Sequence, residues 1–167
     1  MVNYPYLPSN RDVKFVPLDN PFMAEAKAFC KEHTTDRNHP TGAVIVKDGA
    51  IIGRAANQSG YKSKILIEWH KKWMCFRKWF KIKSGEKYWI CPGCSTSKQH
   101  AESGAVREAL KNTKDISGVD LYLWGHWWCC KPCWDAMINA GIKDVYLLEN
   151  SSELFDKNNS KNIIGKF

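Results

Sequence analysis

The chain has 167 residues and a formal net charge of +8 at pH 7, with ordinary fractions of hydrophobic (44%) and charged (25%) residues. Such a chain is long enough to bury a hydrophobic core, and its charge favours an anionic partner such as a nucleotide phosphate or a nucleic acid. No apolar run approaches the about 20 residues that cross a bilayer, and the N-terminal sequence MVNYPYLPSNRDVKF lacks a signal-peptide pattern, so we expect a cytoplasmic protein with no membrane contact.

The first part of the chain predicts an arm, a helix and a hairpin. Residues 1–20 contain several prolines and show little periodicity, which indicates an extended arm. Pro21 suits the first turn of a helix, which we expect to run to about Glu32. The stretch TGAVIVKDGAIIGRAAN, residues 41–57, predicts a β-hairpin that turns at its central Lys-Asp-Gly.

Residues 60–98 differ in kind, because they combine many lysines with aromatic residues. Apolar side chains recur at spacings of three and four, which predicts an amphipathic helix over part of this segment; they are Ile65, Trp69, Trp73, Phe76 and Phe80. We interpret the aromatic stripe as part of the core or of a subunit contact. The lysines could instead bind a phosphate or, together with the aromatics, a single nucleic-acid strand.

The last third alternates helices with strands. We expect a helix from His100, a strand over 119–125, a helix from the KPC sequence to Gly141 and a strand over 143–148, with Ser151 or Ser152 capping a short helix in the tail. Helices that alternate with short strands predict a layered α/β fold. We expect one domain, residues 1–167, with the basic and aromatic segment at about 60–98 as an insertion.

The cysteines point to metal binding. There are seven, an odd number that fits a disulfide framework poorly, and two CxxC pairs are typical of metal ligands in a reducing compartment. His100, Cys130 and Cys133 provide the three N and S ligands that a catalytic zinc uses, with the fourth position open for water. Each of the two ligand groups lies at the start of a predicted helix, where the helix dipole favours thiolate.

Glu102 lies two residues after His100 and gives this site an acid–base group. Zinc lowers the pKa of a water ligand to about 7, which supplies a nucleophile at neutral pH. A carboxylate close to that water can take its proton and pass it to the substrate. A purely structural zinc would not need such a group, so we predict a catalytic zinc.

The order of HAE, residues 100–102, and CKPC, residues 130–133, resembles the cytidine/deoxycytidylate deaminase superfamily, closest to deoxycytidylate (dCMP) deaminases. The resemblance spans roughly residues 21–148, including the hairpin and the segment INAGIKDVYLL. It implies a three-layer α/β/α fold with a mixed five-stranded sheet, and zinc-dependent hydrolytic deamination of a cytosine nucleotide. It also implies a homo-oligomer, and substrate contacts from Asn57 and from the backbone of Ala101.

The chain departs from the family pattern beside these motifs. Cys129 replaces a proline, and Gly104 replaces an asparagine. His126 and Trp128 replace a hydroxyl and a small residue, so we expect them to line the pocket, where the tryptophan can stack on a base. His33 and His39 are interpreted as surface or capping residues in preference to ligands. These changes leave the exact substrate open.

Cys91 and Cys94, in the sequence CPGC, predict a knuckle that presents two thiolates to a second, structural zinc. Two more ligands are needed. Cys75 and His70 are the nearest candidates, and Cys30 and His33 are further ones. The competing interpretation is two buried thiols in a turn. Some dCMP deaminases carry a second zinc from this general region, so the resemblance permits one here.

Three alternative functions remain at this point. One is a deaminase of the riboflavin-pathway pyrimidine, although that family has a long spacer between its zinc cysteines. A second is an enzyme that acts on a base in RNA or single-stranded DNA, such as a transfer-RNA adenosine deaminase. A third is a zinc-binding module without turnover. The ribose or deoxyribose preference, the number of phosphates and regulation by triphosphates are not indicated by the sequence.

Overall fold

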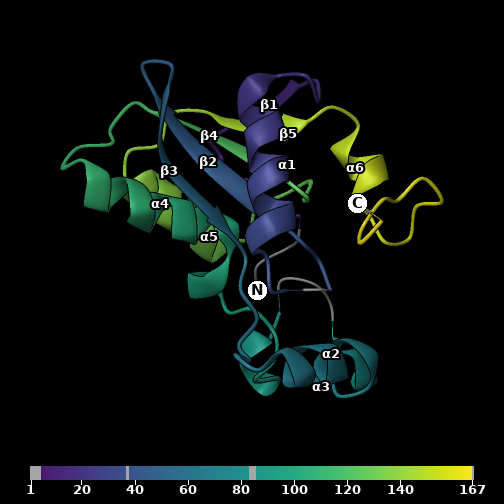
Figure 1. Cartoon of the computed structure of the whole chain (residues 1–167). Coiled ribbons are helices and arrows are strands. Elements are labelled where there is room, and N and C mark those ends of the chain that lie inside the picture. Colours follow the sequence, from purple (N-terminus) through teal and green to yellow (C-terminus); the bar gives the residue numbers. More distant parts are fainter. Residues whose placement is uncertain (1–4, 37, 83–85, 167) are drawn as a thin grey trace.

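The computed structural model describes residues 5–36, 38–82 and 86–166, and within them the chain builds a five-stranded mixed sheet (Figure 1). The strands lie in the order β1-β5-β4-β2-β3, where β1 and β5 run parallel, β5 and β4 run parallel, and β2 is antiparallel to both β4 and β3. The predicted mixed five-stranded sheet is confirmed. The strand bounds are β1 Val13–Val16, β2 Gly42–Lys47, β3 Ala50–Ala56, β4 Asp120–Trp124 and β5 Val145–Leu148.

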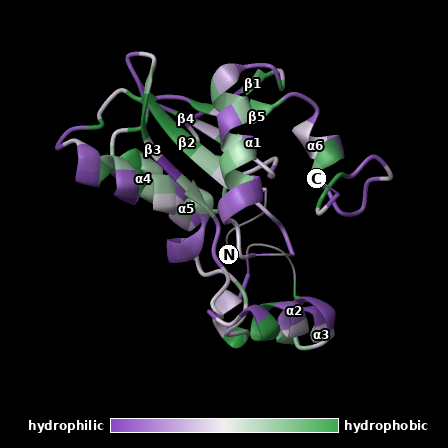
Figure 2. Cartoon of the chain, viewed as in Figure 1, coloured by the Kyte–Doolittle hydropathy of each residue, from purple (hydrophilic) through white to green (hydrophobic). Residues whose placement is uncertain are grey.

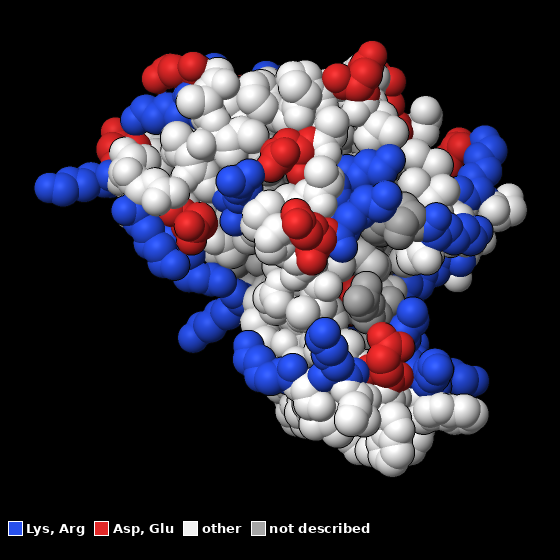
Figure 3. All heavy atoms as spheres, in the orientation of Figure 1, with Lys and Arg blue, Asp and Glu red and all other residues white. Residues whose placement is uncertain are grey.

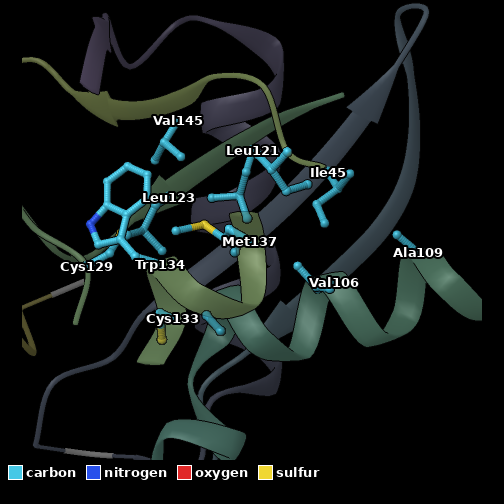
Figure 4. Packing of buried hydrophobic residues seen from close by; sticks show 14 of the residues in the cluster. Ile45, Val106, Ala109, Leu121, Leu123, Cys129, Cys133, Trp134, Met137 and Val145 are labelled. Carbon is cyan, nitrogen blue, oxygen red and sulfur yellow. The ribbon is translucent and has the colours of Figure 1, made fainter. Parts of the chain in front are cut away.

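Helices cover both faces of the sheet, as the α/β/α prediction requires. Helices α4 (Ala101–Asn112) and α5 (Lys131–Asn139) pack on one face, and α1 (Pro21–His33) packs on the other (Figure 1). Two buried clusters fill these layers because successive strand residues point to opposite faces. Figure 4 shows the α4/α5 side, where Leu121, Leu123 and Met137 meet.

The local sequence explains the element boundaries. The side chain of Asn20 accepts hydrogen bonds from the backbone N–H groups of Phe22 and Met23, which caps α1 at its first turn. The hairpin turns at Asp48 and Gly49, both with positive φ, the conformation that a tight two-residue β-turn requires. The helix and hairpin predictions are therefore confirmed to within a residue or two.

Two details at the ends of the chain differ from the prediction. The N-terminal arm contains β1, which pairs with β5 and forms an edge of the sheet. Residues 1–4 of the predicted arm lie outside the described residues. In the tail, the short helix α6 (Ser151–Leu154) is preceded by Asn150 with φ 57°, so the residue at the cap position is Asn150 and not a serine.

Residues 60–98 are called the lobe from here on, and their described parts, 60–82 and 86–98, extend away from the sheet as a separate group of short elements (Figure 1). They are α2 (Lys64–Lys72), α3 (Phe76–Trp79), and the 3-10 turns η1 (Tyr88–Ile90) and η2 (Ser97–Gln99). The buried interior of the lobe consists of Cys75, Cys91 and Cys94 with Phe76 and Tyr88 packed against them.

Of the two interpretations of the aromatic stripe, membership of the core is wrong, whereas a subunit contact stays a prediction. Helix α2 buries Ile67 and His70 instead, while Trp69 and Trp73 are 56% and 71% exposed. The physical reason is that the lobe interior is small and is already occupied by cysteines and one histidine, which leaves no space for the tryptophan side chains. None of the helices in the described ranges combines the length and the apolar character that crossing a membrane demands.

Candidate active site

The three residues predicted to hold a catalytic zinc come together where α4 and α5 begin. His100 immediately precedes α4, Cys130 immediately precedes α5, and Cys133 lies in the first turn of α5. The sulfur atoms of the two cysteines are 3.3 Å apart, and Nδ1 of His100 lies 3.5 Å from Cys130 Sγ and 3.4 Å from Cys133 Sγ. Two helix N-termini therefore face one point.

This trio fits a zinc ion. Ligands at about 2.0–2.3 Å from a tetrahedral zinc lie roughly 3.5 Å from one another, which is close to the spacing of these three atoms. Hydrogen bonds from Cys133 and from His100 lower the pKa of Cys130 to about 5, so its sulfur is a thiolate at neutral pH. Thiolate is the form that binds metal.

Glu102 lies beside the trio in the first turn of α4 and is 5% exposed. Burial raises the pKa of its carboxyl group above the ordinary value, against the opposing charge of His100. A raised pKa makes the carboxylate a stronger base, so the group can accept a proton and later return it, as a proton shuttle requires.

A cavity of ≈ 280 Å³ opens in front of these residues, between the sheet domain and the lobe. Its lining includes all four residues that the sequence predicts as substrate contacts: Asn57, Ala101, His126 and Trp128. The lobe supplies a second wall, from which Arg77, Lys78, Ile82 and Tyr88 reach the cavity. The site is therefore built from both parts of the chain.

Asn57 uses most of its hydrogen-bonding capacity to hold the loop that precedes β2. Its Oδ1 accepts from the backbone N–H of Thr41 (2.9 Å) and from the hydroxyl of Thr34 (2.8 Å). Its Nδ2 donates to the backbone carbonyl of His39 (2.8 Å). Since an amide nitrogen carries two hydrogens, one remains for a ligand in the cavity.

His126 and His39 stack with ring centroids 4.5 Å apart and both line the cavity. His126 Nδ1 accepts hydrogen bonds from the backbone N–H groups of Trp127 and Trp128, so its proton is on Nε2. Burial lowers the pKa of His126 well below its ordinary value and that of His39 to about 4, so both rings are neutral at pH 7. His39 is half-buried in the cavity wall, so it is neither a freely exposed surface residue nor part of the zinc-ligand trio.

His39 is placed by contacts that its local sequence does not reveal. Its Nε2 lies 2.8 Å from the backbone carbonyl of Gly125, at the end of β4, 86 residues further along the chain. Ser103 is another residue that the sequence did not indicate, and its hydroxyl lies 3.7 Å from Cys133 Sγ. Cys129, by contrast, packs into the core beside Trp134 and stays out of the trio (Figure 4).

The lobe contains a second group of metal-binding side chains, formed by His70, Cys75, Cys91 and Cys94. All four residues are buried, and their ligand atoms lie within 4.8 Å of one another. Nε2 of His70 is 3.1 Å from Cys91 Sγ and 3.6 Å from Cys94 Sγ, and Cys75 Sγ is 3.7 Å from Cys94 Sγ. Four N and S ligands with no open position are typical of a structural zinc.

Gly93, in the CPGC turn, explains how His70 approaches the two cysteines. A Cβ atom at Gly93 would lie 2.5 Å from the His70 ring, so any side chain there would displace the histidine. Two of the weaker candidates do not take part. Cys30 belongs to α1 and is buried in the core cluster on that side of the sheet, and His33 stacks on Phe29 at 4.0 Å.

The two groups of metal-binding side chains are connected through two residues of the lobe. The guanidinium of Arg77 lies 3.9 Å from Cys94 Sγ and 4.0 Å from the centroid of the Tyr88 ring. Tyr88 in turn meets the ring of His100 edge to face, with centroids 5.4 Å apart. The lobe therefore contacts the active-site histidine directly.

Comparison with known proteins gives one match to a family model, which describes the cytidine and deoxycytidylate deaminase zinc-binding region and covers residues 17–149. No curated protein matches the chain in a search. Among solved structures, the chain is similar to a dCMP deaminase from the cyanophage S-TIM5, with 21% identity over 80% of this chain and 86% of the phage chain and a TM-score of 0.47.

Another similar structure is the diaminohydroxyphosphoribosylaminopyrimidine deaminase/5-amino-6-(5-phosphoribosylamino)uracil reductase from Thermotoga maritima. It is 26% identical over 75% of this chain, with a TM-score of 0.46. The match spans only 28% of that longer protein.

Proposed function

Because the chain belongs to the cytidine and deoxycytidylate deaminase family and is a zinc-dependent deaminase, we propose that it converts a cytosine nucleotide, of the dCMP or CMP type, to the corresponding uracil nucleotide. Water supplies the oxygen that replaces the amino group at C4, and ammonia leaves. The observation that carries this proposal is the buried carboxyl group of Glu102 beside His100, Cys130 and Cys133 at the cavity.

In this proposal His100, Cys130 and Cys133 hold the catalytic zinc, which supplies Lewis acidity and lowers the pKa of a water molecule at the site to about 7. Glu102 accepts the proton of the attacking water. It then donates that proton to N3 of the cytosine ring. The same carboxyl group next carries the proton of the new C4 hydroxyl group to the amino nitrogen, which leaves as ammonia while the C4 carbonyl forms. The raised pKa of Glu102 supports both directions of transfer.

The walls of the cavity orient the base. Trp128 offers an aromatic ring for stacking, and its own ring meets His126 edge to face at 4.8 Å. His126 presents a neutral Nε2–H donor, because its Nδ1 is occupied by backbone N–H groups. Asn57 donates through its remaining amide hydrogen, and Ala101 contributes a backbone group.

We propose that the substrate carries a phosphate, because cations from two parts of the chain reach the cavity. Arg77 and Lys78 come from the lobe and Lys157 from the C-terminal segment, and Asp36 is an opposing carboxylate in the same lining. Asp36 already accepts hydrogen bonds from Ser95 and from the backbone of Asn38. A phosphate between the three cations would form charge-assisted hydrogen bonds.

We further propose that the chain is a single deaminase domain into which the lobe is inserted, and that His70, Cys75, Cys91 and Cys94 hold a structural zinc there. Thiolate ligands persist in a reducing compartment, so we place the protein in the cytoplasm. Leu110 on α4 and Ile138 on α5 are 48% and 37% exposed, which supports a homo-oligomer formed through these helices. Light scattering on the purified protein tests the last point.

The experiment that tests the substrate is ammonia release by the zinc-replete protein. The panel contains cytosine, cytidine, deoxycytidine, and the mono- and triphosphates of both nucleosides. We expect a monophosphate to be converted with the highest kcat/KM, and Lys157→Gln to raise KM for that nucleotide while kcat for the unphosphorylated nucleoside stays unchanged. Equal conversion of nucleosides and nucleotides would contradict the phosphate part of the proposal.

A second candidate substrate is a base within RNA or single-stranded DNA. The observation in its favour is that the lobe, rich in lysines and aromatics, forms a wall of the same cavity. A short cytosine-containing oligonucleotide added to the panel distinguishes the two. Conversion of the oligonucleotide without conversion of any free nucleotide would show that the substrate is a base within a nucleic acid.

A further inference from the structure

The positive charge of the protein is concentrated in the lobe. Residues 60–98 contain nine lysines and one arginine against two glutamates, a formal charge of +8, which equals the charge of the whole chain. The remaining residues are therefore neutral overall. Each lysine in the described part of the lobe is exposed. Figure 3 shows blue side chains around the lobe, at the bottom of that view, with little red among them.

The lobe also exposes most of its large aromatic side chains. Trp89 is 80% exposed, and Trp69, Trp73, Trp79 and Phe80 are all more than half exposed. On α2, Trp69 and the residue at its C-cap, Trp73, are four positions apart and lie on the same side as Ile65, away from the buried His70. Figure 2 shows hydrophobic and hydrophilic residues mixed along the ribbons of α2 and α3.

A group of exposed aromatic side chains on one part of a protein often marks a surface that a partner covers. The interior of the lobe has no room for these side chains. Its interior is filled by the four metal-binding side chains with Phe76 and Tyr88. A partner for this surface must be strongly anionic, and it must have flat apolar faces. Single-stranded nucleic acid has both properties, because its phosphates pair with lysines and each base stacks on an aromatic ring.

We propose that the outer surface of the lobe is a binding site for single-stranded nucleic acid, separate from the deamination of free nucleotides. The residues that form it are the exposed aromatics Trp69, Trp73, Trp79, Phe80 and Trp89 and the exposed lysines of the same segment. Recognition is independent of sequence, since stacking and phosphate contacts do not distinguish bases. The binding does not require that the strand be deaminated.

Charge argues against a second copy of the chain as the partner. Two lobes facing each other would bring two charges of +8 together, and the rest of the chain offers no net negative charge to receive a lobe. A rigid duplex fits less well than a single strand, because its bases are stacked on one another and cannot cover the tryptophans.

The test is fluorescence anisotropy with labelled oligothymidylate and oligouridylate of about 20 nucleotides. These strands contain no cytosine, so binding is measured without any contribution from the proposed reaction. Unlabelled polyphosphate and a DNA duplex serve as competitors. We expect the single strand to bind, polyphosphate of equal charge to compete poorly, and affinity to fall about 100-fold between about 50 and 200 mM salt if about five phosphates are neutralised.

Single substitutions separate stacking from charge. Trp73→Ala and Trp89→Ala are each expected to weaken binding about 5- to 150-fold, the range for loss of one stacked base. Phe15→Ala is the matched control, because Phe15 is 55% exposed on β1 and lies outside the lobe. Lys64→Gln is expected to reduce the salt dependence of binding, and Lys111→Gln on α4 is its control.

Several results would overturn the inference. They are no binding at low salt, competition by polyphosphate as strong as by the oligonucleotide, or tryptophan variants that bind like wild type. Self-association that is abolished by Trp73→Ala, in the absence of oligonucleotide binding, would assign the surface to a subunit contact. Because the probes lack cytosine, each of these results leaves the deaminase proposal standing.

Discussion

The rings of Tyr88 and His100 meet edge to face, with centroids 5.4 Å apart and planes at 82°. Tyr88 belongs to the lobe, and His100 belongs to the proposed catalytic zinc site. Since Arg77 connects Tyr88 to Cys94, the lobe positions the active-site histidine through a continuous set of contacts. The lobe metal site should therefore affect catalysis through Arg77 and Tyr88.

Loss of the lobe zinc is expected to reduce both metal content and activity. Cys91→Ser should lower the zinc content from about two ions to about one per chain. It should also lower kcat/KM about 10- to 100-fold, the usual effect of disturbing groups that orient a metal ligand. Cys30→Ala is the control, because Cys30 is a buried residue of α1 that lies outside both metal-binding groups. Full activity of Cys91→Ser with one zinc would show that the lobe does not position His100.

Removal of the Tyr88 ring should weaken the catalytic zinc site specifically. Tyr88→Ala takes away the contact with His100, so we expect about 10-fold weaker retention of one of two zinc ions against a chelator. Tyr88→Phe retains the ring and should behave much more like wild type. If the two variants lose zinc equally, the edge-to-face contact has no positioning role.

Asn57 should matter for stability as well as for substrate binding. Asn57→Ala leaves the N–H of Thr41, the hydroxyl of Thr34 and the carbonyl of His39 without this partner. The Thr34 hydroxyl keeps the backbone carbonyl of residue 57 as a partner, so two groups are left unpaired. At about 1–3 kcal/mol for each, we expect a loss of about 2–6 kcal/mol in the free energy of unfolding. Urea unfolding measures this, with the exposed Asn112→Ala as control. A loss below about 0.5 kcal/mol would contradict the structural role.

His39 should make folding stability depend on pH. Burial, reinforced by the charge of Lys157, lowers its pKa to about 4, whereas an unfolded histidine has a pKa of about 6.5. The unfolded state therefore binds more protons between these values, and this stability is present above pH about 6.5 and lost as the pH falls towards about 4.

His39→Gln removes this titration. Between pH about 7.5 and about 5, the variant should lose about 2 kcal/mol less in the free energy of unfolding than wild type does. Zinc release at acid pH affects both proteins, so the difference between their two curves is the quantity to compare. Parallel curves would show that His39 is not buried in its neutral form.

The sheet and the grouping of His100, Cys130 and Cys133 could be predicted because their signals are local. The hairpin depends on a turn sequence and on apolar alternation, and α1 depends on Pro21 and its periodicity. His100, Cys130 and Cys133 were identifiable because each ligand lies at the start of a helix, and the packing of α4 against α5 brings these starts together.

The rest depends on contacts between distant residues. Strand β1 has only four residues and is defined by its pairing with β5, more than a hundred residues away. His39 enters the cavity through its contact with Gly125. The aromatic stripe of α2 has the periodicity of a buried face, but periodicity does not say which side of a helix is covered. In α2, the side that faces the cysteines of the lobe carries His70, so Trp69 and Trp73 lie on the solvent-exposed side.

In the proposed reaction Glu102 transfers protons beside the zinc but is not itself a zinc ligand. The most direct measurement is ammonia release and zinc content of Glu102→Gln beside Glu108→Gln, on the converted nucleotide. Glu108 lies on the same helix and pairs with Lys111 at the surface. We predict that Glu102→Gln keeps its zinc and loses turnover at least about 100-fold, while Glu108→Gln keeps both. Unchanged turnover in Glu102→Gln would contradict the account.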